Sequence, residues 1–366
     1  MTNRSEQLLD LAIQIQQIAA PTFAEQARAE FVRGLFIRQG LLDVTMDTVS
    51  NVYGRLPGRG TARPLIVSAH LDTVFPANTR LAVSRETDRI FGPGIGDNSL
   101  GVAALFGLIW TLRDRGCTPA GDIWLVGNVG EEGLGNLRGM NAVADRFGEA
   151  VLAYLVLEGT ALGHVYHRAI AVQRYRVWVR TAGGHSWSDF GRPSAIHELA
   201  RIVTQMTTLP MPASPRTSLN VGMISGGTGV NVLAPEASLE LDVRSESPEV
   251  LSTLVGRVQE IVQAARREGV SSEIEMIGQR PSGEIDRNHP LVKLAERCLL
   301  EQGLEASFTS GSTDANVPLS RGYPALVLGI TTGGSAHTVQ EYIDVRPVEQ
   351  GMQQLASFVE NVFSIH

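Results

Sequence analysis

The chain has 366 residues, of which 43% are hydrophobic and 19% charged, and its formal net charge is −7. This composition is typical of a globular protein, and the length favours more than one domain. The acidic balance argues against binding to nucleic acid or to an anionic membrane, since both need a basic surface. The 2 cysteines provide neither a disulfide framework nor a zinc cluster.

The N-terminal segment interleaves apolar residues with Asp and Gln at helical spacing, which predicts an amphipathic helix and not a signal peptide. Two helices are expected over about residues 5–19 and 23–39, separated by Pro21. The most apolar stretch, at about residues 102–110, is shorter than the roughly 20 residues that span a bilayer. We therefore expect a cytoplasmic protein without a membrane partner.

Short apolar runs that predict buried strands alternate with helical patterns through most of the chain. These runs cover residues 65–70, 123–129, 151–157 and 325–330. Continuous apolar strands that alternate with helices indicate an α/β domain with a mostly parallel sheet, covered by helices on both faces. Such sheets bind their ligands at the carboxyl ends of the strands.

The pattern changes between residues 172 and 280, where amphipathic strands and helices follow in the order β-α-β-β-α-β. This order predicts a small ferredoxin-like α+β domain inserted into the larger one. We therefore expect a catalytic domain formed by residues 1–171 and 281–366, interrupted by an inserted domain at residues 172–280.

Five residues of metal-binding type follow predicted strands or lie in loops. They are His70, Asp97, Glu132, Glu158 and His337. Zinc binds imidazole nitrogen and carboxylate oxygen, with about four ligands per ion. Five residues suffice for two ions if one carboxylate bridges them and a water completes each. Asp97, in a glycine-rich turn at a helix start, is the natural bridge. The set suits a dinuclear hydrolase.

Two further carboxylates, Glu131 and Asp72, flank this set. Adjacent side chains in a loop point in different directions, so Glu132 can bind metal while Glu131 faces the metal-bound water as general base. Asp72 shares a face with His70 and can fix the proton on one imidazole nitrogen. Taken singly, these residues have simpler explanations, such as a helix cap at Asp97 or a solvated Glu-Glu turn. Their joint occurrence favours a site.

Taken together, these segments resemble the co-catalytic dizinc exopeptidases and deacylases, which include glutamate carboxypeptidase, peptidase T, succinyl-diaminopimelate desuccinylase and aminoacylase. The resemblance extends over nearly the whole chain. The motifs that carry it are His70-Leu71-Asp72-Thr73-Val74, Gly96-Asp97-Asn98, Glu131-Glu132-Gly133, Glu158, Gly184-His185-Ser186, Asn231, Gly311-Ser312-Thr313-Asp314-Ala315 and His337-Thr338.

The resemblance implies two Zn²⁺ ions per subunit, with Co²⁺ or Mn²⁺ as alternatives. The implied ligand sets are His70, Asp97 and Glu158 for one ion, and Asp97, Glu132 and His337 for the other. It also implies that Glu131 is the general base, that Asp72 orients His70, and that the Asp97–Asn98 peptide is cis. Glu158 is a departure, because many members carry aspartate there.

For the inserted domain, the resemblance implies a lid that also forms a homodimer. His185 would reach the partner subunit's site and stabilise the oxyanion of the tetrahedral intermediate. The residues expected to hold a substrate carboxylate are Asn231, Arg280 and Arg244. Trp187 and Phe190 lie beside His185, and we expect them to pack within the lid, with an apolar wall for the substrate as the alternative.

The function that follows is metal-dependent hydrolysis of an amide bond in a short peptide or an N-acyl amino acid, by a water bridged between two zinc ions. A dipeptidase, tripeptidase or carboxypeptidase is favoured, and an N-acyl-amino-acid deacylase is the alternative. A two-metal phosphoesterase could use the same ligand types. A non-catalytic peptide-binding protein is the other remote possibility.

Overall fold

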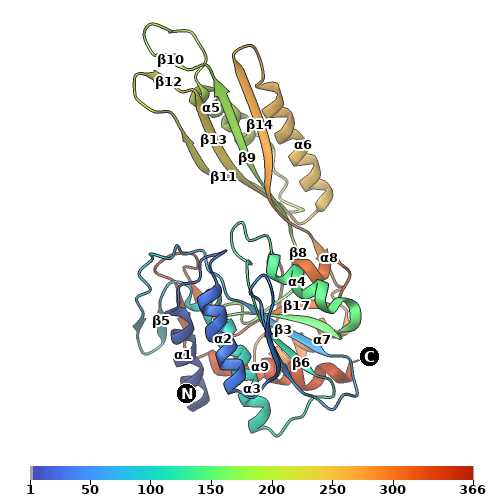
Figure 1. Ribbon diagram of the computed structural model, residues 1–366. Coiled ribbons are helices and arrows are strands. Elements are labelled where there is room, and N and C mark those ends of the chain that lie inside the picture. The colour runs from blue at the N-terminus through green and yellow to red at the C-terminus, as the bar shows by residue number, and fades with distance from the viewer. Residues whose placement is uncertain (1–2, 366) are drawn as a thin grey trace. The chain divides into compact units, whose positions relative to one another are not determined.

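The computed structural model describes residues 3–365, which form two compact units. Unit 1 is formed by the chain up to Ala169 and from Gly283 onward, and unit 2 by Ile170–Ser282. Figure 1 labels the elements of both units.

Unit 1 contains a nine-stranded sheet and most of the helices. The strands run in the order β1 (Leu42–Met46), β2 (Val52–Leu56), β6 (Ile123–Asn128), β3 (Leu65–His70), β7 (Ala153–Glu158), β17 (Ala325–Gly329), β8 (His164–Ala169) and β15 (Gly283–Glu284), with β16 (Ser307–Gly311) beside β8. The helices are α1 (Asn3–Gln16), α2 (Gln26–Arg38), α3 (Gly101–Asp114), α4 (Arg138–Phe147), α7 (Pro290–Glu301), α8 (Asn316–Ser320) and α9 (Val348–Asn361), with short turns η1 (Ile95–Leu100), η2 (Gly148–Ala150) and η3 (Val362–Ser364).

The centre of this sheet is parallel: β3 pairs in parallel with β6 and β7, and β17 with β7. Antiparallel strands flank this parallel centre: β2 pairs antiparallel with β6, and β8 pairs antiparallel with β17. The predicted α/β class is thereby confirmed. A second, small sheet formed by β18 (Gly333–Gly334), β19 (Tyr342–Asp344), β5 (Arg89–Phe91) and β4 (Ser84–Arg85) was not predicted, because its strands are too short to show an apolar period.

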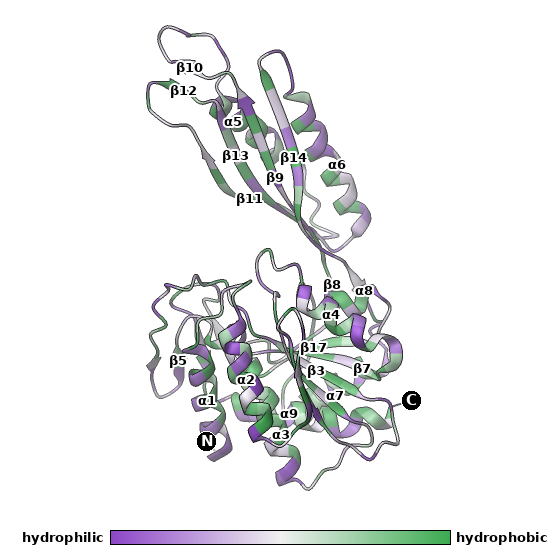
Figure 2. Ribbon diagram, viewed as in Figure 1, coloured by the Kyte–Doolittle hydropathy of each residue, from purple (hydrophilic) through white to green (hydrophobic). Residues whose placement is uncertain are grey.

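Alternate residues of the central strands enter two different cores. In β7, Leu155 and Leu157 join the core that contains α1, α3 and α9, whereas Tyr154 and Val156 join the core that contains α4 and α8. Both faces of the strands are covered, which explains why their sequences are continuously apolar. Figure 2 shows the hydrophobic colouring of these strands.

Helix α3 is apolar nearly all round because it lies inside the first of these cores. Its Phe106 ring packs against Phe36 of α2, with ring centroids 5.2 Å apart. Within residues 3–365, the stretch Ile95–Asp114 is the single helical segment long and apolar enough to cross a membrane, and 89% of its most apolar window is buried inside the structure. A buried core helix passes the same test.

Unit 2 is an antiparallel sheet covered by two helices on one face (Figure 1). Its strands run in the order β11 (Thr217–Gly226), β13 (Glu236–Ser245), β9 (Ala171–Thr181) and β14 (Val270–Arg280), and its helices are α5 (Ala195–Thr207) and α6 (Pro248–Ala264). A two-stranded ribbon, β10 (Gly184–His185) with β12 (Val232–Leu233), lies off this sheet. The order of the main elements along the chain confirms the predicted α+β fold.

Candidate active site

The predicted metal ligands come from five separate segments of unit 1. His70 and Glu158 are the last residues of β3 and β7, and Glu132 lies in the loop that follows β6. Asp97 lies in η1, directly before α3, and His337 lies between β18 and β19. The carboxyl ends of parallel neighbours β6, β3 and β7 meet at one edge of the sheet, and this topology brings side chains distant in the sequence together.

Two groups of three side chains bring their ligand atoms within 4.8 Å of one another. They are His70, Asp97 and Glu158, and Asp97, Glu132 and His337. Asp97 belongs to both groups. Its Oδ1 lies 3.1 Å from His70 Nε2, and its Oδ2 lies 3.1 Å from His337 Nε2. The two oxygens of one carboxylate therefore face two different imidazoles, as a bridging ligand requires.

The chemistry of these side chains fits divalent cations. Imidazole nitrogen and carboxylate oxygen are the ligand atoms that zinc accepts in catalytic sites. Glu132 Oε1 is buried and has no hydrogen-bond partner among the described residues, although it lies 3.3 Å from His337 Nε2. A buried oxygen without a donor is costly unless a cation or water satisfies it.

The electrostatics of the cluster without metal favour bound protons. Burial raises the pKa values of Glu132 and Glu158 to about 7. A hydrogen bond to Asp97 and the nearby carboxylate of Glu132 raise the pKa of His337 to about 10. Burial disfavours the charged form of His70, but hydrogen bonds to the surrounding carboxylates outweigh it and hold that pKa well above its ordinary value. Protons on these side chains therefore compete with metal ions for the same ligand atoms.

Asp72 holds the turn that carries the two glutamates. Its Oδ1 accepts a hydrogen bond from the backbone N–H of Glu131 at 3.0 Å, and its Oδ2 accepts one from the N–H of Glu132 at 2.9 Å. The Asp72 carboxylate lies 3.6 Å from His70 Nδ1, whereas the Asp72 backbone carbonyl lies 3.1 Å from that nitrogen. The acceptor closest to His70 Nδ1 is therefore the carbonyl, and the carboxylate mainly binds backbone.

Glu131, the predicted general base, is buried next to Glu132 at the end of β6. The turn is bounded by Gly130 with φ +70° and Gly133 with φ +53°. Glycine adopts this left-handed conformation without steric cost, so the chain can turn sharply on either side of the glutamate pair. The two side chains consequently leave the strand end from adjacent backbone positions in a tightly defined turn.

Glu341 positions the loop of Asp97, a role that the sequence analysis missed. Its carboxylate accepts hydrogen bonds from the backbone N–H groups of Gly94, Gly96 and Asp97, each at 2.8 Å. Burial raises the pKa of Glu341 to about 7. The signal available in the sequence was an acidic residue four positions after His337.

Asn98 connects the same loop to the end of β7. The Asp97–Asn98 peptide is cis, in agreement with what the family resemblance implies. The Asn98 side chain donates a hydrogen bond to the Leu157 carbonyl at 2.8 Å and accepts one from the Gly159 N–H at 3.0 Å. These bonds bracket Glu158, so the loop and the strand end that supply one ligand group are tied together.

A buried hydrogen-bonded pair lies at the end of β6. Asn128, the last residue of β6, donates a hydrogen bond to Asp314 Oδ2 at 2.7 Å. Both side chains are fully buried, and burial raises the pKa of Asp314 well above its ordinary value. The motif around Asp314 contributed to the family resemblance, but its sequence did not predict this contact.

The four predicted site residues of unit 2 fall into two groups. Register pairs Arg244 of β13 and Arg280 of β14 with Val172 of β9 from opposite sides, so both arginines share one face of the sheet at the beginning of β9. Arg280 is buried, whereas Arg244 is partly buried and pairs with Asp242 at 2.5 Å.

The other two, His185 and Asn231, lie beyond the opposite end of β9. His185 pairs with Val232 in the ribbon, and the Ser186 N–H donates to the Asn231 carbonyl at 3.0 Å. An eleven-residue strand is about 35 Å long, so β9 separates these two residues from Arg244 and Arg280. One copy of unit 2 therefore does not bring all four predicted residues together.

The hydrogen bonds of His185 define its tautomer. Its Nδ1 accepts from the backbone N–H groups of Trp187 at 3.2 Å and Ser188 at 3.4 Å. An Nδ1 that accepts has no proton in the neutral ring, so Nε2 carries it and is a donor. The expectation that Trp187 and Phe190 pack within the lid is wrong for this unit. They are 86% and 89% exposed, because the turn that binds His185 Nδ1 directs them outward.

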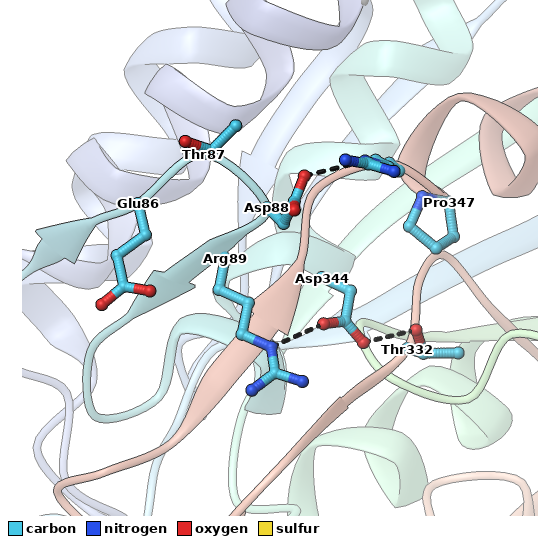
Figure 3. Close-up of a pocket in the computed structure, with 8 residues that line it drawn as sticks. Glu86, Thr87, Asp88, Arg89, Thr332, Asp344 and Pro347 are labelled. Atoms are coloured by element: carbon cyan, nitrogen blue, oxygen red, sulfur yellow. Dashed lines mark hydrogen bonds and ion pairs between the residues drawn. The ribbon is translucent and has the colours of Figure 1, made fainter.

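A cavity of about 610 Å³ opens elsewhere in unit 1, beside the small sheet (Figure 3). Its lining contains none of the predicted site residues. Two ion pairs cross it, Arg89 with Asp344 at 3.1 Å and Arg346 with Asp88 at 2.7 Å. Both of its arginines are thus paired with acids, and the described residues that line it include no histidine, so we assign the chemistry to the histidine–carboxylate cluster instead.

A mostly parallel α/β unit with this cluster at the carboxyl edge of its sheet, and an inserted α+β unit, defines a metal-dependent hydrolase. More specifically, the model of peptidase family M20/M25/M40 matches residues 66–361, and the chain belongs to that family.

Individual relatives are distant. Carboxypeptidase G2 of Pseudomonas sp. (strain RS-16) is 24% identical over 84% of this chain and 76% of its own length. A tripeptidase from Staphylococcus aureus has a TM-score of 0.83 at 22% identity, with 98% of this chain and 99% of that chain covered. YXEP of Bacillus subtilis, described as a dinuclear metal binding peptidase, has a TM-score of 0.71 at 15% identity, with 99% of each chain covered. These structures share the fold.

Metal binding is expected to release protons. At pH 7 both imidazoles of the metal-free cluster carry protons, and the carboxyls of Glu132 and Glu158, with pKa values of about 7, hold about one more between them. Metal binding must displace these protons, so it should release about three protons per chain. The same competition should raise the apparent affinity as pH increases from about 6 to 9. Calorimetric titration of Zn²⁺ into the chelator-treated protein, in buffers of different ionisation enthalpy, measures both quantities. Binding at pH 7 without proton release would contradict the protonated cluster.

Proposed function

We propose that the protein hydrolyses an amide bond in a short peptide or an N-acyl amino acid, with two zinc ions as cofactors. The observation that carries the proposal is the shared carboxylate of Asp97, whose two oxygens each lie 3.1 Å from a different histidine, with the glutamate pair in the adjacent turn. Membership of the peptidase family supports a peptide substrate. The similarity to a carboxypeptidase and to a tripeptidase favours short peptides.

Each ion would be held by one histidine and two carboxylates, with Asp97 common to both. Co²⁺ or Mn²⁺ would suit the same ligand atoms. Bound divalent ions supply two effects here: they lower the pKa of a water and polarise the substrate carbonyl. The chain's own contribution is to fix the ligands, through Asp72 and Glu341, and to provide the proton transfer.

Glu131 would act as general base and then as general acid. It would take a proton from the attacking water and deliver it to the leaving amine. Its backbone N–H is anchored on Asp72, so its carboxylate starts from a fixed point beside Glu132. Proton transfer by a positioned side chain contributes roughly 10²–10⁴-fold to a rate.

His185 would donate its Nε2–H to the oxyanion of the tetrahedral intermediate. Arg280 and Arg244, together with Asn231, would hold a substrate carboxylate. Because β9 separates His185 and Asn231 from the two arginines, a small substrate could use both groups if two copies of unit 2 contributed. This separation supports a homodimer in which His185 serves the partner subunit's site. The cytoplasmic location expected from the sequence stays a prediction.

A substrate panel tests the reaction directly. We expect the zinc-loaded protein to hydrolyse di- or tripeptides, or peptides with a free C-terminal residue, faster than N-acetyl amino acids. The reverse preference would identify a deacylase that uses the same groups. Amine release measured across the amide substrates, together with alcohol release from a phosphodiester, separates these outcomes. Hydrolysis of the phosphodiester alone, or of no substrate at all, would contradict the proposal.

Glu131→Gln keeps the shape of the side chain and removes its basicity. We expect kcat to fall by about 10²–10⁴-fold while the metal content and the melting temperature stay close to wild type. The exposed Glu301→Gln on α7 serves as the matched control and should keep full activity. Turnover of the Glu131 variant near the wild-type rate would exclude this residue as the base.

Complementation between two inactive variants tests the shared site. A mixed dimer of His185→Ala and Glu131→Gln chains has one intact site if His185 acts across the dimer, and none if it acts within its own chain. We therefore expect purified mixed dimers, isolated through two different affinity tags, to show about half of the wild-type activity per dimer. An inactive mixed dimer, with both tags present, would argue against the shared site.

A further inference from the structure

The geometry points to Thr22 as a positioning residue for the reaction: its hydroxyl holds the Asp72 carboxylate, and through it the turn of Glu131 and Glu132. This inference rests on the proposed function, because it assigns to Thr22 the task of setting the base and one metal ligand. Thr22 lies between α1 and α2, in a segment for which the sequence analysis predicted only a break after Pro21.

The contact is direct, and its Asp72 end is fully buried. Thr22 Oγ1 donates to Asp72 Oδ2 at 2.9 Å, and its other acceptor, the Glu132 carbonyl, is more distant at 3.4 Å. Asp72 has no exposed surface, so its hydrogen bonds replace the water it would otherwise bind. Two of the donors are the N–H groups of Glu131 and Glu132. Thr22 provides a third, from a side chain that a substitution can remove.

The segment that carries Thr22 is hydrogen-bonded to the residues on either side of Asp72. The Thr73 N–H donates to the Ala20 carbonyl at 2.9 Å, and Pro21 forms a parallel bridge with Thr73. The buried guanidinium of Arg28 donates to the Ile18 carbonyl at 3.0 and 2.7 Å and to the Leu71 carbonyl at 2.8 Å. Thr22 therefore has little freedom to move away from the carboxylate.

Arg28 also compensates the charge of Asp72. Burial lowers the pKa of Arg28 to about 10, which still leaves it charged at neutral pH. The acceptors of its hydrogen bonds, the Ile18 and Leu71 carbonyls, are neutral, so its positive charge acts on Asp72 through space. A buried carboxylate with a cation nearby stays ionised and accepts all three hydrogen bonds.

A second set of contacts joins the Thr22 segment to the start of α4, which follows the turn of Glu131 and Glu132. Glu25 accepts two hydrogen bonds from Arg138, at 3.2 and 2.8 Å, and Arg138 is the first residue of α4. The Arg138 guanidinium also lies over the Phe23 ring, 5.0 Å from its centroid. The turn between β6 and α4 is thus held by Asp72 near its start and by the Thr22 segment where α4 begins.

These contacts indicate what the Thr22 hydroxyl does for the reaction. Without this hydroxyl, Asp72 Oδ2 keeps the N–H of Glu132 as a donor, and the carboxylate can rotate. Such a rotation would shift the amides of Glu131 and Glu132 together, and with them the base relative to the metal ligands. Displacements well below 1 Å at a catalytic group lower the rate without greatly weakening substrate binding.

Isosteric substitutions separate this role from simple packing. Thr22→Val keeps the shape and removes the hydroxyl, whereas Thr22→Ser keeps the hydroxyl and removes the methyl group. Thr111→Val is the matched control, because the Thr111 hydroxyl donates to the Gly107 carbonyl at 2.8 Å near the end of α3 remote from Asp97. Both threonines are partly buried.

We expect Thr22→Val to lower kcat about tenfold with KM changed less than about twofold, and Thr22→Ser and Thr111→Val to stay within about twofold of wild type. Hydrogen exchange followed by mass spectrometry gives a readout that needs no substrate. The peptide that contains Glu131 and Glu132 should exchange several-fold faster in Thr22→Val than in the other two variants, in metal-free and zinc-loaded protein alike.

The results distinguish this inference from the proposed function. If wild type hydrolyses no amide in the panel, the proposed function fails, and the exchange measurement alone decides whether Thr22 orders the turn. Equal kcat in Thr22→Val and Thr22→Ser would overturn the inference while leaving the function intact. Hydrogen exchange at wild-type rates in Thr22→Val would overturn it as well. A loss of kcat that Thr22→Ser shows to the same extent as Thr22→Val would also overturn it. If Thr22→Val does not fold, a Thr22→Ser variant with reduced kcat and faster exchange would also overturn it.

Discussion

The site depends on one constraint: three carboxylates and two imidazoles must share a small volume at the edge of a sheet. Without compensation, the charges of Asp97, Glu132 and Glu158 repel one another, and burial raises that cost. The histidines provide part of the compensation when they are protonated, which explains why the pKa of His337 rises to about 10. Divalent ions would replace those protons with a larger positive charge in the same place.

Two acids outside the ligand set keep this arrangement in place. Asp72 accepts the N–H groups of the turn that carries Glu132, and Glu341 accepts three N–H groups of the loop that carries Asp97. In both cases a buried carboxylate binds backbone, so the main chain from which the ligand side chain extends is held in place. This is the more rigid solution, since a backbone amide has few alternative positions once its neighbours are packed.

Much of this could be predicted from the sequence, and the parts that could not share a physical cause. The parallel sheet was predictable because both faces of its strands are buried, and the ligands because they follow strand ends, as His70 and Glu158 do. Thr22 and Glu341 were not predictable, because they act through hydrogen bonds to residues 50 and 244 positions away, at sites with no periodic signal.

The outward direction of Trp187 and Phe190 was mispredicted for a related reason. Large aromatic side chains are usually buried, and that statistical preference favoured packing within the unit. The structure shows instead that the imidazole of His185 caps the turn through its Nδ1, which fixes the backbone and leaves both rings exposed. The preference describes the average burial of a residue type, and it carries no information about the local hydrogen bonds that shape this turn.

The two functions of Asp72 couple the metal ligands to the base. The H-x-D spacing predicted a partner for the His70 imidazole, and the carboxylate does lie 3.6 Å from His70 Nδ1. Its stronger hydrogen bonds, however, are with the N–H groups of Glu131 and Glu132. Burial would raise the pKa of Asp72, but its interactions with His70 and with these two amides lower it below the ordinary value, so it remains an acceptor. One ionised group thus sets the distance between a metal ligand on β3 and the base after β6, and a displacement of either is transmitted to the other.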